Sequence, residues 1–198
     1  MSVHITDIHA REILDSRGNP TLEVLVHTNV GAIGRASVPS GASTGAREAL
    51  ELRDTHDARF GGRGVMAAVG HVRGDIREVL VGRAYRDQIE LDEALIELDG
   101  TPDKLRLGAN AIVGVSMAVA RAFAAQDGEP LWRSLARSAD RALLPVPHFN
   151  VVNGGAHAAG ALEFQEFMLA PLGARTERED VAIAPVFARF RFSWEPRT

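Results

Sequence analysis

The fold is decided by the stretch VHITDIHAREILDSRGNPTLEVLVHT, residues 3–28. Its two runs rich in β-branched residues, 3–13 and 21–28, flank Asp15-Ser-Arg-Gly-Asn-Pro20, a cluster of turn formers. This pattern predicts a β-hairpin. A third apolar stretch, residues 32–38, predicts another strand and leads into Pro39-Ser-Gly-Ala-Ser-Thr-Gly45, where small residues favour a loop.

Helical patterns follow the three predicted strands. Residues 47–53 are rich in the helix formers Ala, Leu and Glu, and residues 65–80 carry apolar side chains at close to helical spacing. Another helix is expected from Asp87 to Gly100, and residues 108–126 are apolar nearly all round, as in a helix packed on both sides. This order predicts an α+β domain over about residues 1–137, with the helices on one face of a three-stranded antiparallel sheet.

The character of the chain changes after this predicted domain. Residues 142–152 contain two prolines and a β-branched run, which ends at Asn153-Gly-Gly155, and residues 164–170 predict a further strand. A second unit therefore begins in this region. In the final segment, residues 181–198, aromatic side chains alternate with arginines, and its pattern fits an extended tail as well as a helix or a strand.

Composition limits the classes of function. The chain has 198 residues, of which 45% are hydrophobic and 24% charged, as is typical of a globular protein. A formal net charge of -4 provides no positive field for nucleic acid or an anionic membrane. The absence of cysteine excludes disulfides, thiolate metal sites and a cysteine nucleophile, and makes the cytoplasm the default expectation.

No targeting or spanning segment is predicted. The first ten residues alternate apolar with polar side chains and lack the pattern of a signal peptide. The most apolar stretch, residues 109–125, falls short of the roughly 20 residues that a membrane span requires. We therefore expect this stretch to be a buried helix.

The loop Pro39–Gly45 has two interpretations. Its small residues expose backbone N–H groups that can hold an anion, and Ser43 or Thr44 can offer an oxygen to Mg²⁺. It is not a Walker loop, because it contains no lysine. An ordinary surface loop has the same composition, so both interpretations stay open on these residues alone.

A second candidate site lies in residues 153–166. The motif Asn153-Gly-Gly-Ala-His157 precedes Gln165 and Glu166, which places an imidazole and a carboxylate on either side of a glycine- and alanine-rich stretch. Such a pair can bind a phosphate and polarise a hydroxyl. A histidine near glycines is more often structural, so this interpretation also stays open, and Glu163 fits a solvated carboxylate.

Other patterns support no chemistry. The remaining histidines show no metal-ligand spacing, and Ser116 lacks the second glycine of a nucleophile elbow. The interleaved phenylalanines and arginines of residues 187–194 suggest stacking on single-stranded nucleic acid, but the acidic chain disfavours that partner.

Several long segments nevertheless agree, in order and spacing, with one known family. The segments are Arg11-Glu-Ile-Leu-Asp-Ser-Arg-Gly-Asn-Pro-Thr21, Val38-Pro-Ser-Gly-Ala-Ser-Thr-Gly45, Glu48-Ala-Leu-Glu-Leu-Arg-Asp54, Gly108-Ala-Asn-Ala-Ile112, Leu144-Pro-Val-Pro147 and residues 153–171. In these segments the chain resembles enolase (phosphopyruvate hydratase). The resemblance covers residues 3 to about 175.

This resemblance implies a small α+β amino-terminal domain followed by the start of a (β/α)₈ barrel. It also implies Mg²⁺-dependent dehydration of 2-phosphoglycerate to phosphoenolpyruvate in glycolysis, a carbon–oxygen lyase reaction. Ser43 resembles the loop serine that binds the second Mg²⁺. His157 resembles the histidine that contacts substrate, and Gln165 and Glu166 resemble strand residues near the substrate hydroxyl, with Glu166 in a catalytic role.

The resemblance further implies that groups needed for this chemistry are missing. Family members take a lysine base, three metal carboxylates and a further glutamate from later barrel strands, and a full barrel takes roughly 250 residues. The single lysine of this chain, Lys104, matches no family base. We therefore expect the chain to be inactive alone, and a frameshift or premature stop in an enolase gene is our hypothesis for the cause.

The predicted organisation has three parts. Residues 1–137 form the amino-terminal domain, residues 138–175 the first barrel strands, and residues 176–198 a divergent tail in which Pro185 interrupts the expected helix. The open edges of the barrel strands favour association, either of like chains or with full-length enolase. A non-catalytic binding module or remnant is therefore the alternative to a lyase, and neither nucleic acid nor a membrane is an expected partner.

Overall fold

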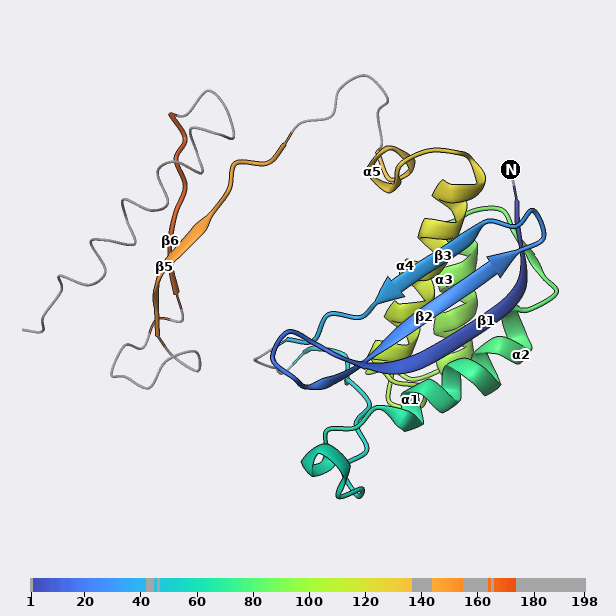
Figure 1. The fold of residues 1–198 in the computed structure, drawn as a ribbon, viewed down its shortest axis with the longest axis horizontal. Helices are drawn as coiled ribbons and strands as arrows, with labels where there is room; N and C mark the ends of the chain where they lie inside the picture. The colour runs from blue at the N-terminus through green and yellow to red at the C-terminus, as the bar shows by residue number, and fades with distance from the viewer. Residues whose placement is uncertain are drawn as a thin grey trace, which may run out of the picture. The chain divides into compact units, whose positions relative to one another are not determined.

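The computed structural model describes residues 2–41, 45, 47–136, 144–154, 164 and 166–173. The chain divides into two units, residues 1–139 and 140–198, and each is described here by itself. Figure 1 shows the helices and strands of both units.

The first unit contains a four-stranded antiparallel sheet in the order β3-β2-β1-β4. The three predicted strands are confirmed: β1 is Val3–Leu14, β2 is Pro20–Thr28 and β3 is Ile33–Ser37. No pattern in the sequence predicts β4 (Ala84–Tyr85), which pairs with Val3 and His4 of β1. A strand of two residues is too short to show an alternating pattern, which is why three strands were predicted instead of four.

The turn between β1 and β2 is built as its composition predicts. One carboxylate oxygen of Asp15 accepts hydrogen bonds from the backbone N–H groups of Arg17 and Asn19, both at 2.8 Å. Gly18 takes a φ of 77°, in the left-handed region that suits glycine. The turn therefore fixes the register of the two long strands.

Helices follow the first three strands of the first unit. The expected helix at residues 65–80 is continuous through a π-helical turn, and the expected helix after Asp87 begins with the Asp87 carboxylate accepting from the N–H of Glu90 at 2.9 Å. It ends at Gly100, whose φ is 69°. The elements are η1 (Arg59–Gly62), α1 (Met66–His71), η2 (Val72–Ile76), α2 (Arg77–Leu80), α3 (Gln88–Asp99), α4 (Ala109–Gln126) and α5 (Leu131–Ser134).

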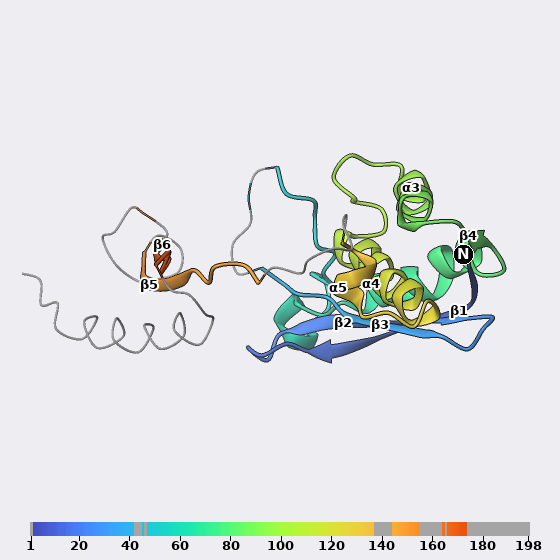
Figure 2. The same ribbon diagram turned by 90° about the horizontal axis from the view of Figure 1, so that it is seen from above.

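The core lies between the sheet and α4. Leu22, Val24 and Val26 alternate along β2 and are fully buried, as expected of strand residues that share one face. Figure 2 shows α3 and α4 on one face of the sheet, as the sequence predicted. The approach of α4 to β3 is very close: a Cβ atom added to Gly34 would lie 1.8 Å from the carbonyl oxygen of Ala118.

By length and composition alone, α4 could cross a membrane. Ala111, Val115 and Ala118 on this helix are completely buried in the core of the first unit. Among the residues that the structure describes, no other helix meets the same criterion. The burial of α4 is that of a core helix of a globular domain, as the sequence predicted.

The helix expected at residues 47–53 is absent, so that prediction is wrong. Tertiary hydrogen bonds hold this segment in a non-helical path: the N–H of Leu50 donates to Asp103 O at 2.9 Å, and the N–H of Ala109 donates to Leu50 O at 2.8 Å. The buried Asn110 side chain completes the tether, because its Oδ1 accepts from Leu52 N–H at 3.1 Å and its Nδ2 donates to Leu52 O at 3.0 Å. These bonds outweigh local helix propensity, which is at most about 1 kcal/mol per ordinary residue.

The face of the sheet opposite the helices carries a buried carboxylate. Glu23 on β2 is 1% exposed, and it accepts hydrogen bonds from the guanidinium groups of Arg11 on β1 and Arg35 on β3 at 2.7 and 2.5 Å. Burial by itself raises the pKa of Glu23, but the hydrogen bonds from Arg35 and Arg11 outweigh it and hold this pKa below its ordinary value. Glu23 is therefore charged in the folded protein.

Replacing Glu23 with glutamine is expected to make the free energy of unfolding depend less on pH in the acidic range. A folded-state pKa below the unfolded value of about 4.5 adds stability above that pH, and this part of the stability is lost as the pH falls through the folded pKa. Urea denaturation at a series of pH values between 7 and 3 measures the effect. If the free energy of unfolding changes with pH equally in the wild type and in Glu23→Gln below pH 5, Arg11 and Arg35 do not lower the pKa of Glu23.

The second unit contains an antiparallel pair, β5 (Phe149–Asn153) and β6 (Glu166–Leu169). A β-bulge between Asn150 and Val152 shifts the register by one residue. Residues paired across the two strands point to the same face of the sheet. In this pair, one face carries apolar side chains and the other carries most of the polar ones. Phe149, Val152, Phe167 and Leu169 share one face, and Asn150, Asn153, Glu166 and Met168 share the other.

Candidate functional site

A first candidate site, in the first unit, is the start of the loop that follows β3, where Arg53 is the central residue. Its Nη1 donates to the carbonyl oxygens of Pro20 and Arg63 at 2.6 and 2.7 Å. Its Nη2 donates to Ser40 Oγ at 3.1 Å and to Glu51 Oε1 at 2.7 Å. One guanidinium therefore ties the hairpin turn, the chain before α1 and the start of the loop Pro39–Gly45 to one another.

The loop start borders a hollow of about 240 Å³. Ser40 Oγ donates to Glu51 Oε2 at 3.1 Å on one side of it, and Asn110 and Val113 from the start of α4 form another side. A larger open depression of about 550 Å³ lies beside residues 53–58. The carboxylate of Asp54 there already accepts from the N–H groups of Met66 and Ala67, so it acts as a cap for α1.

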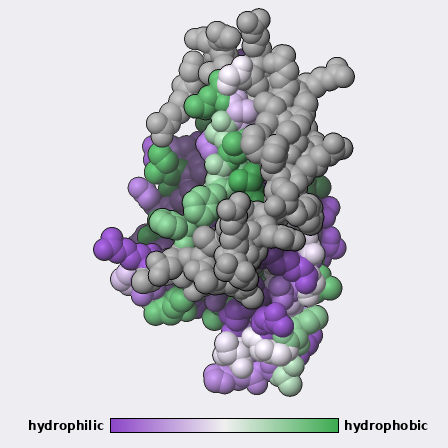
Figure 3. All heavy atoms as spheres, turned by 90° about the vertical axis from the view of Figure 1, so that its left-hand side faces the viewer, coloured by the Kyte–Doolittle hydropathy of each residue, from purple (hydrophilic) through white to green (hydrophobic). Residues whose placement is uncertain are grey.

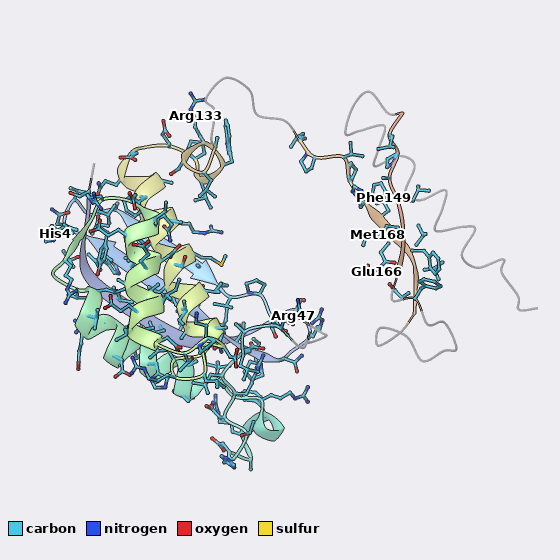
Figure 4. The ribbon with its side chains drawn as sticks, turned by 180° about the vertical axis from the view of Figure 1, so that it is seen from behind. His4, Arg47, Arg133, Phe149, Glu166 and Met168 are labelled. Carbon is cyan, nitrogen blue, oxygen red and sulfur yellow. The ribbon has the colours of Figure 1, made fainter. Side chains whose placement is uncertain are left out.

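A second candidate site, in the second unit, is the polar face of the β5–β6 pair. Asn150 Nδ2 donates to Glu166 Oε2 at 2.6 Å, across the two strands. Figure 4 shows Glu166 at one end of the pair, with Phe149 and Met168 farther along the strands. The hydrogen bond fixes one carboxylate oxygen and leaves Oε1 without a partner among the described residues, so Oε1 can face a substrate.

Most of the predicted site residues lie outside the part of the chain that the structure describes. Ser43, His157 and Gln165 are in this group, and their roles stay predictions. Glu166 is described as the first residue of β6. Lys104 lies in the first unit with a φ of 57°, and its ammonium group donates to the carbonyl oxygens of Thr101 and Pro102 at 3.0 and 3.4 Å. That arrangement gives Lys104 a structural role in a turn.

The described residues do not by themselves make a magnesium site. Within residues 2–41, 45, 47–136, 144–154, 164 and 166–173, no three His, Asp or Glu side chains come close enough to hold a metal ion. Mg²⁺ prefers about six oxygen ligands and is usually bound through carboxylates. Glu51 is engaged by Arg53, and Glu166 is the single carboxylate on its face of β5–β6.

Sequence reasoning missed Arg53 and Asn150. Arg53 lies in the segment 47–53 for which the sequence predicts a helix, and no local pattern shows that its side chain reaches Pro20 and Ser40, which are distant in the chain. A signal for Asn150 exists in the alternation of Phe149, Asn150 and the following valines, but it becomes useful only once the register of β5 against β6 is known, in which Asn150 lies opposite Met168 and reaches Glu166 diagonally.

The fold of the first unit defines a class, an α+β domain with helices on one face of an antiparallel sheet, and the second unit adds the antiparallel pair β5–β6. Residues 5–135 match the model of the enolase N-terminal domain, and residues 141–191 match the model of the enolase C-terminal TIM barrel domain. The chain belongs to the enolase family. Its matched domains are those of an enolase-like lyase.

Proposed function

We propose that this chain carries part of the site for the Mg²⁺-dependent dehydration of 2-phosphoglycerate to phosphoenolpyruvate. The observation that carries the proposal is the carboxylate of Glu166, which is oriented by Asn150 on the polar face of β5–β6. In this proposal Glu166 is catalytic, Gln165 and His157 bind substrate, and Ser43 is a ligand of the second Mg²⁺. The cytoplasm is the corresponding compartment.

The proposed role of Glu166 is proton transfer at the substrate hydroxyl. Dehydration breaks a carbon–oxygen bond, and the departing hydroxyl needs a proton in order to leave as water. Glu166 Oε2 is held by Asn150, so Oε1 is the atom that would hold and deliver this proton. Mg²⁺, when bound, stabilises the enolate-like charge that forms next to the substrate carboxylate. The described residues do not complete a metal site.

We further propose that the 198-residue chain does not complete the reaction alone. Proton abstraction from carbon needs a base, which is a lysine or a histidine in sites of this type. The single lysine, Lys104, is bound to two backbone carbonyls in the turn after α3. The histidine of the proposed site, His157, has the role of a substrate contact in this proposal, so the chain supplies substrate contacts and Glu166 but no assigned base.

An assay of phosphoenolpyruvate formation tests the proposed inactivity and, where turnover is found, the role of Glu166. With 2-phosphoglycerate and Mg²⁺, the purified chain is expected to show no turnover above the buffer control. Glu166→Gln is the matched variant, because it keeps the shape of the side chain and its contact with Asn150. Turnover that Glu166→Gln abolishes would overturn the proposed inactivity and support the role of Glu166, whereas turnover unaffected by Glu166→Gln would overturn both.

A non-catalytic binding role is the second candidate function. It is favoured by apolar side chains that the second unit leaves exposed, among them Phe164 at 69% and Leu172 at 81%. In this role the chain associates with a like chain or with full-length enolase. Copurification with full-length enolase, and a change in that enzyme's turnover when the chain is added, would support it.

A further inference from the structure

Asn153 and Gly154 form the junction between β5 and the chain that follows it. Asn153 is the last residue of β5, and Gly154 lies directly after the strand. The chain contains five asparagines, and Asn153 is the only one that precedes a glycine, since the other four precede Pro, Val, Ala and Val. Glycine has no Cβ atom, so nothing on Gly154 itself shields its backbone nitrogen from the neighbouring side chain.

The side chain of Asn153 is less restrained than those of two other asparagines. Asn110 makes two hydrogen bonds to the backbone of Leu52, and Asn150 Nδ2 donates to Glu166 Oε2 at 2.6 Å. Within the part of the chain that the structure describes, no hydrogen bond holds the amide of Asn153. Its carbonyl carbon, Cγ, can therefore turn toward the backbone nitrogen of the next residue.

The end of the β5–β6 pair is expected to open often. A two-stranded sheet is at best marginally stable in water, and large apolar side chains of this pair stay exposed, Phe167 at 44% and Met168 at 53%. Hydrophobic residues reach the molecular surface beside hydrophilic ones in Figure 3. Gly154 is buried in the closed pair, so its nitrogen becomes free to react when the strand end opens.

We propose that Asn153 is a site of spontaneous deamidation, in which the backbone nitrogen of Gly154 is the nucleophile. This nitrogen attacks Cγ of Asn153, and the new C–N bond closes a five-membered succinimide ring. The C–N bond to the side-chain nitrogen breaks, and this nitrogen leaves as ammonia with the proton that Gly154 loses through solvent. Water then opens the ring at either carbonyl, which gives aspartate or isoaspartate. The proposal does not depend on a catalytic role for Glu166.

The product places a second carboxylate beside Glu166. The register of the pair sets Asn153 opposite Glu166, and like charges that lie directly opposite on antiparallel strands are destabilising. Isoaspartate also adds one methylene group to the main chain, which disturbs the pairing at the same position. The modification is therefore expected to loosen the end of the pair at which Glu166 lies.

Peptide mapping after incubation of the full chain in a mildly alkaline buffer tests the proposal. Trypsin releases residues 142–175 as one peptide, because no arginine or lysine lies between Arg141 and Arg175. This peptide carries both Asn150 and Asn153, so Asn150 is an internal control. Fragment ions are expected to locate the conversion at Asn153 alone, as a mixture of aspartate and isoaspartate, with one labelled oxygen taken up from H₂¹⁸O.

Two variants identify the reacting groups. Gly154→Ala adds a Cβ atom beside the attacking nitrogen, and it is expected to remove most of the conversion over the time in which the wild type loses half of its Asn153 amide. Asn153→Gln is the matched variant that keeps Gly154. Its amide is expected to stay intact, because the ring that it would have to form has six members and closes more slowly. Urea should accelerate the wild-type reaction, since unfolding exposes Gly154.

The variant Asn153→Asp imitates the aspartate product. Its backbone amides in β5 and β6 are expected to exchange up to about fivefold faster than those of the wild type, because a carboxylate then opposes Glu166. The uncharged Asn153→Ser is expected to exchange at the wild-type rate. Equal exchange in the two variants would show that the charge of the product does not loosen the pair.

Three results of the mapping would overturn the proposal. One is an Asn153 that stays unmodified in the folded chain but reacts in urea, which would mean that the strand end stays closed. Another is equal conversion of Asn150 and Asn153, or conversion that Gly154→Ala leaves unchanged, since either would indicate attack by water without the ring. The third is aspartate without isoaspartate, because direct hydrolysis of the amide gives aspartate alone.

Discussion

Replacing Gly34 with alanine is expected to lower the free energy of unfolding by about 3 kcal/mol or more. The added Cβ atom would lie 1.8 Å from Ala118 O and 2.6 Å from Ala122 N, and both of these are backbone atoms of α4. No rotation of a side chain can relieve such contacts, so β3 and α4 must separate. Their separation would open the layer between sheet and helix in which Val24 and Val115 are buried.

The same substitution at Gly70 is the matched control for Gly34→Ala. Gly70 lies in α1, and a Cβ atom there would meet no other atom within 4 Å. Because alanine is favoured over glycine in a helix by about 1 kcal/mol, Gly70→Ala is expected to stabilise the protein slightly. Urea denaturation of both variants measures the difference. A Gly34→Ala variant as stable as the wild type would show that β3 and α4 can move apart at little cost.

Replacing Asn110 with alanine is expected to destabilise the protein by about 2–4 kcal/mol. Asn110 is 3% exposed, and its amide makes hydrogen bonds to both the N–H and the C=O of Leu52. Alanine would leave both backbone groups of Leu52 without these partners, and an unpaired buried polar group costs about 1–3 kcal/mol. The loss is also expected to free residues 47–54 locally, so amide exchange at Leu52 should accelerate by more than global unfolding explains.

Asn29→Ala is the control for Asn110→Ala, because Asn29 is exposed in the turn after β2. Its replacement is expected to change stability by less than about 0.5 kcal/mol. Asn110→Asp refines the test: a carboxylate can still accept from Leu52 N–H but cannot donate to Leu52 O. If Asn110→Asp is as stable as the wild type at pH 7, the bond to Leu52 O contributes little.

The sequence predicted those parts of the fold that local patterns determine. Alternation along β1 and β2 is visible in the chain because each strand buries one face, and the helix after Asp87 carries its cap and its terminal Gly100 in the sequence. The error at residues 47–53 arose where tertiary bonds to Asp103 and Asn110 override helix propensity. Such bonds join residues more than fifty positions apart, and a local window cannot detect them.

Less of the candidate site than of the fold could be predicted from the sequence. The motif match identified Glu166, but its partner Asn150 depends on the bulge between Asn150 and Val152. Simple alternation along β5 would have placed Phe149 on one face with Val151 and Asn153, whereas the bulge groups Phe149 with Val152. A bulge changes the parity of every residue beyond it, so the separation into a polar and an apolar face followed only from the strand pairing.

Arg53 joins three segments through its hydrogen bonds: the turn before β2, the loop after β3 and the chain before α1. A guanidinium is a rigid planar fork, so a displacement of the carbonyl of Pro20 is transmitted through it to Ser40 and Glu51. The hairpin turn and the loop after β3 are therefore expected to move together, because the Arg53 guanidinium is bonded to both. The stiffness of the chain that leads to Ser43 is in this way set by residues from three separate stretches of the sequence.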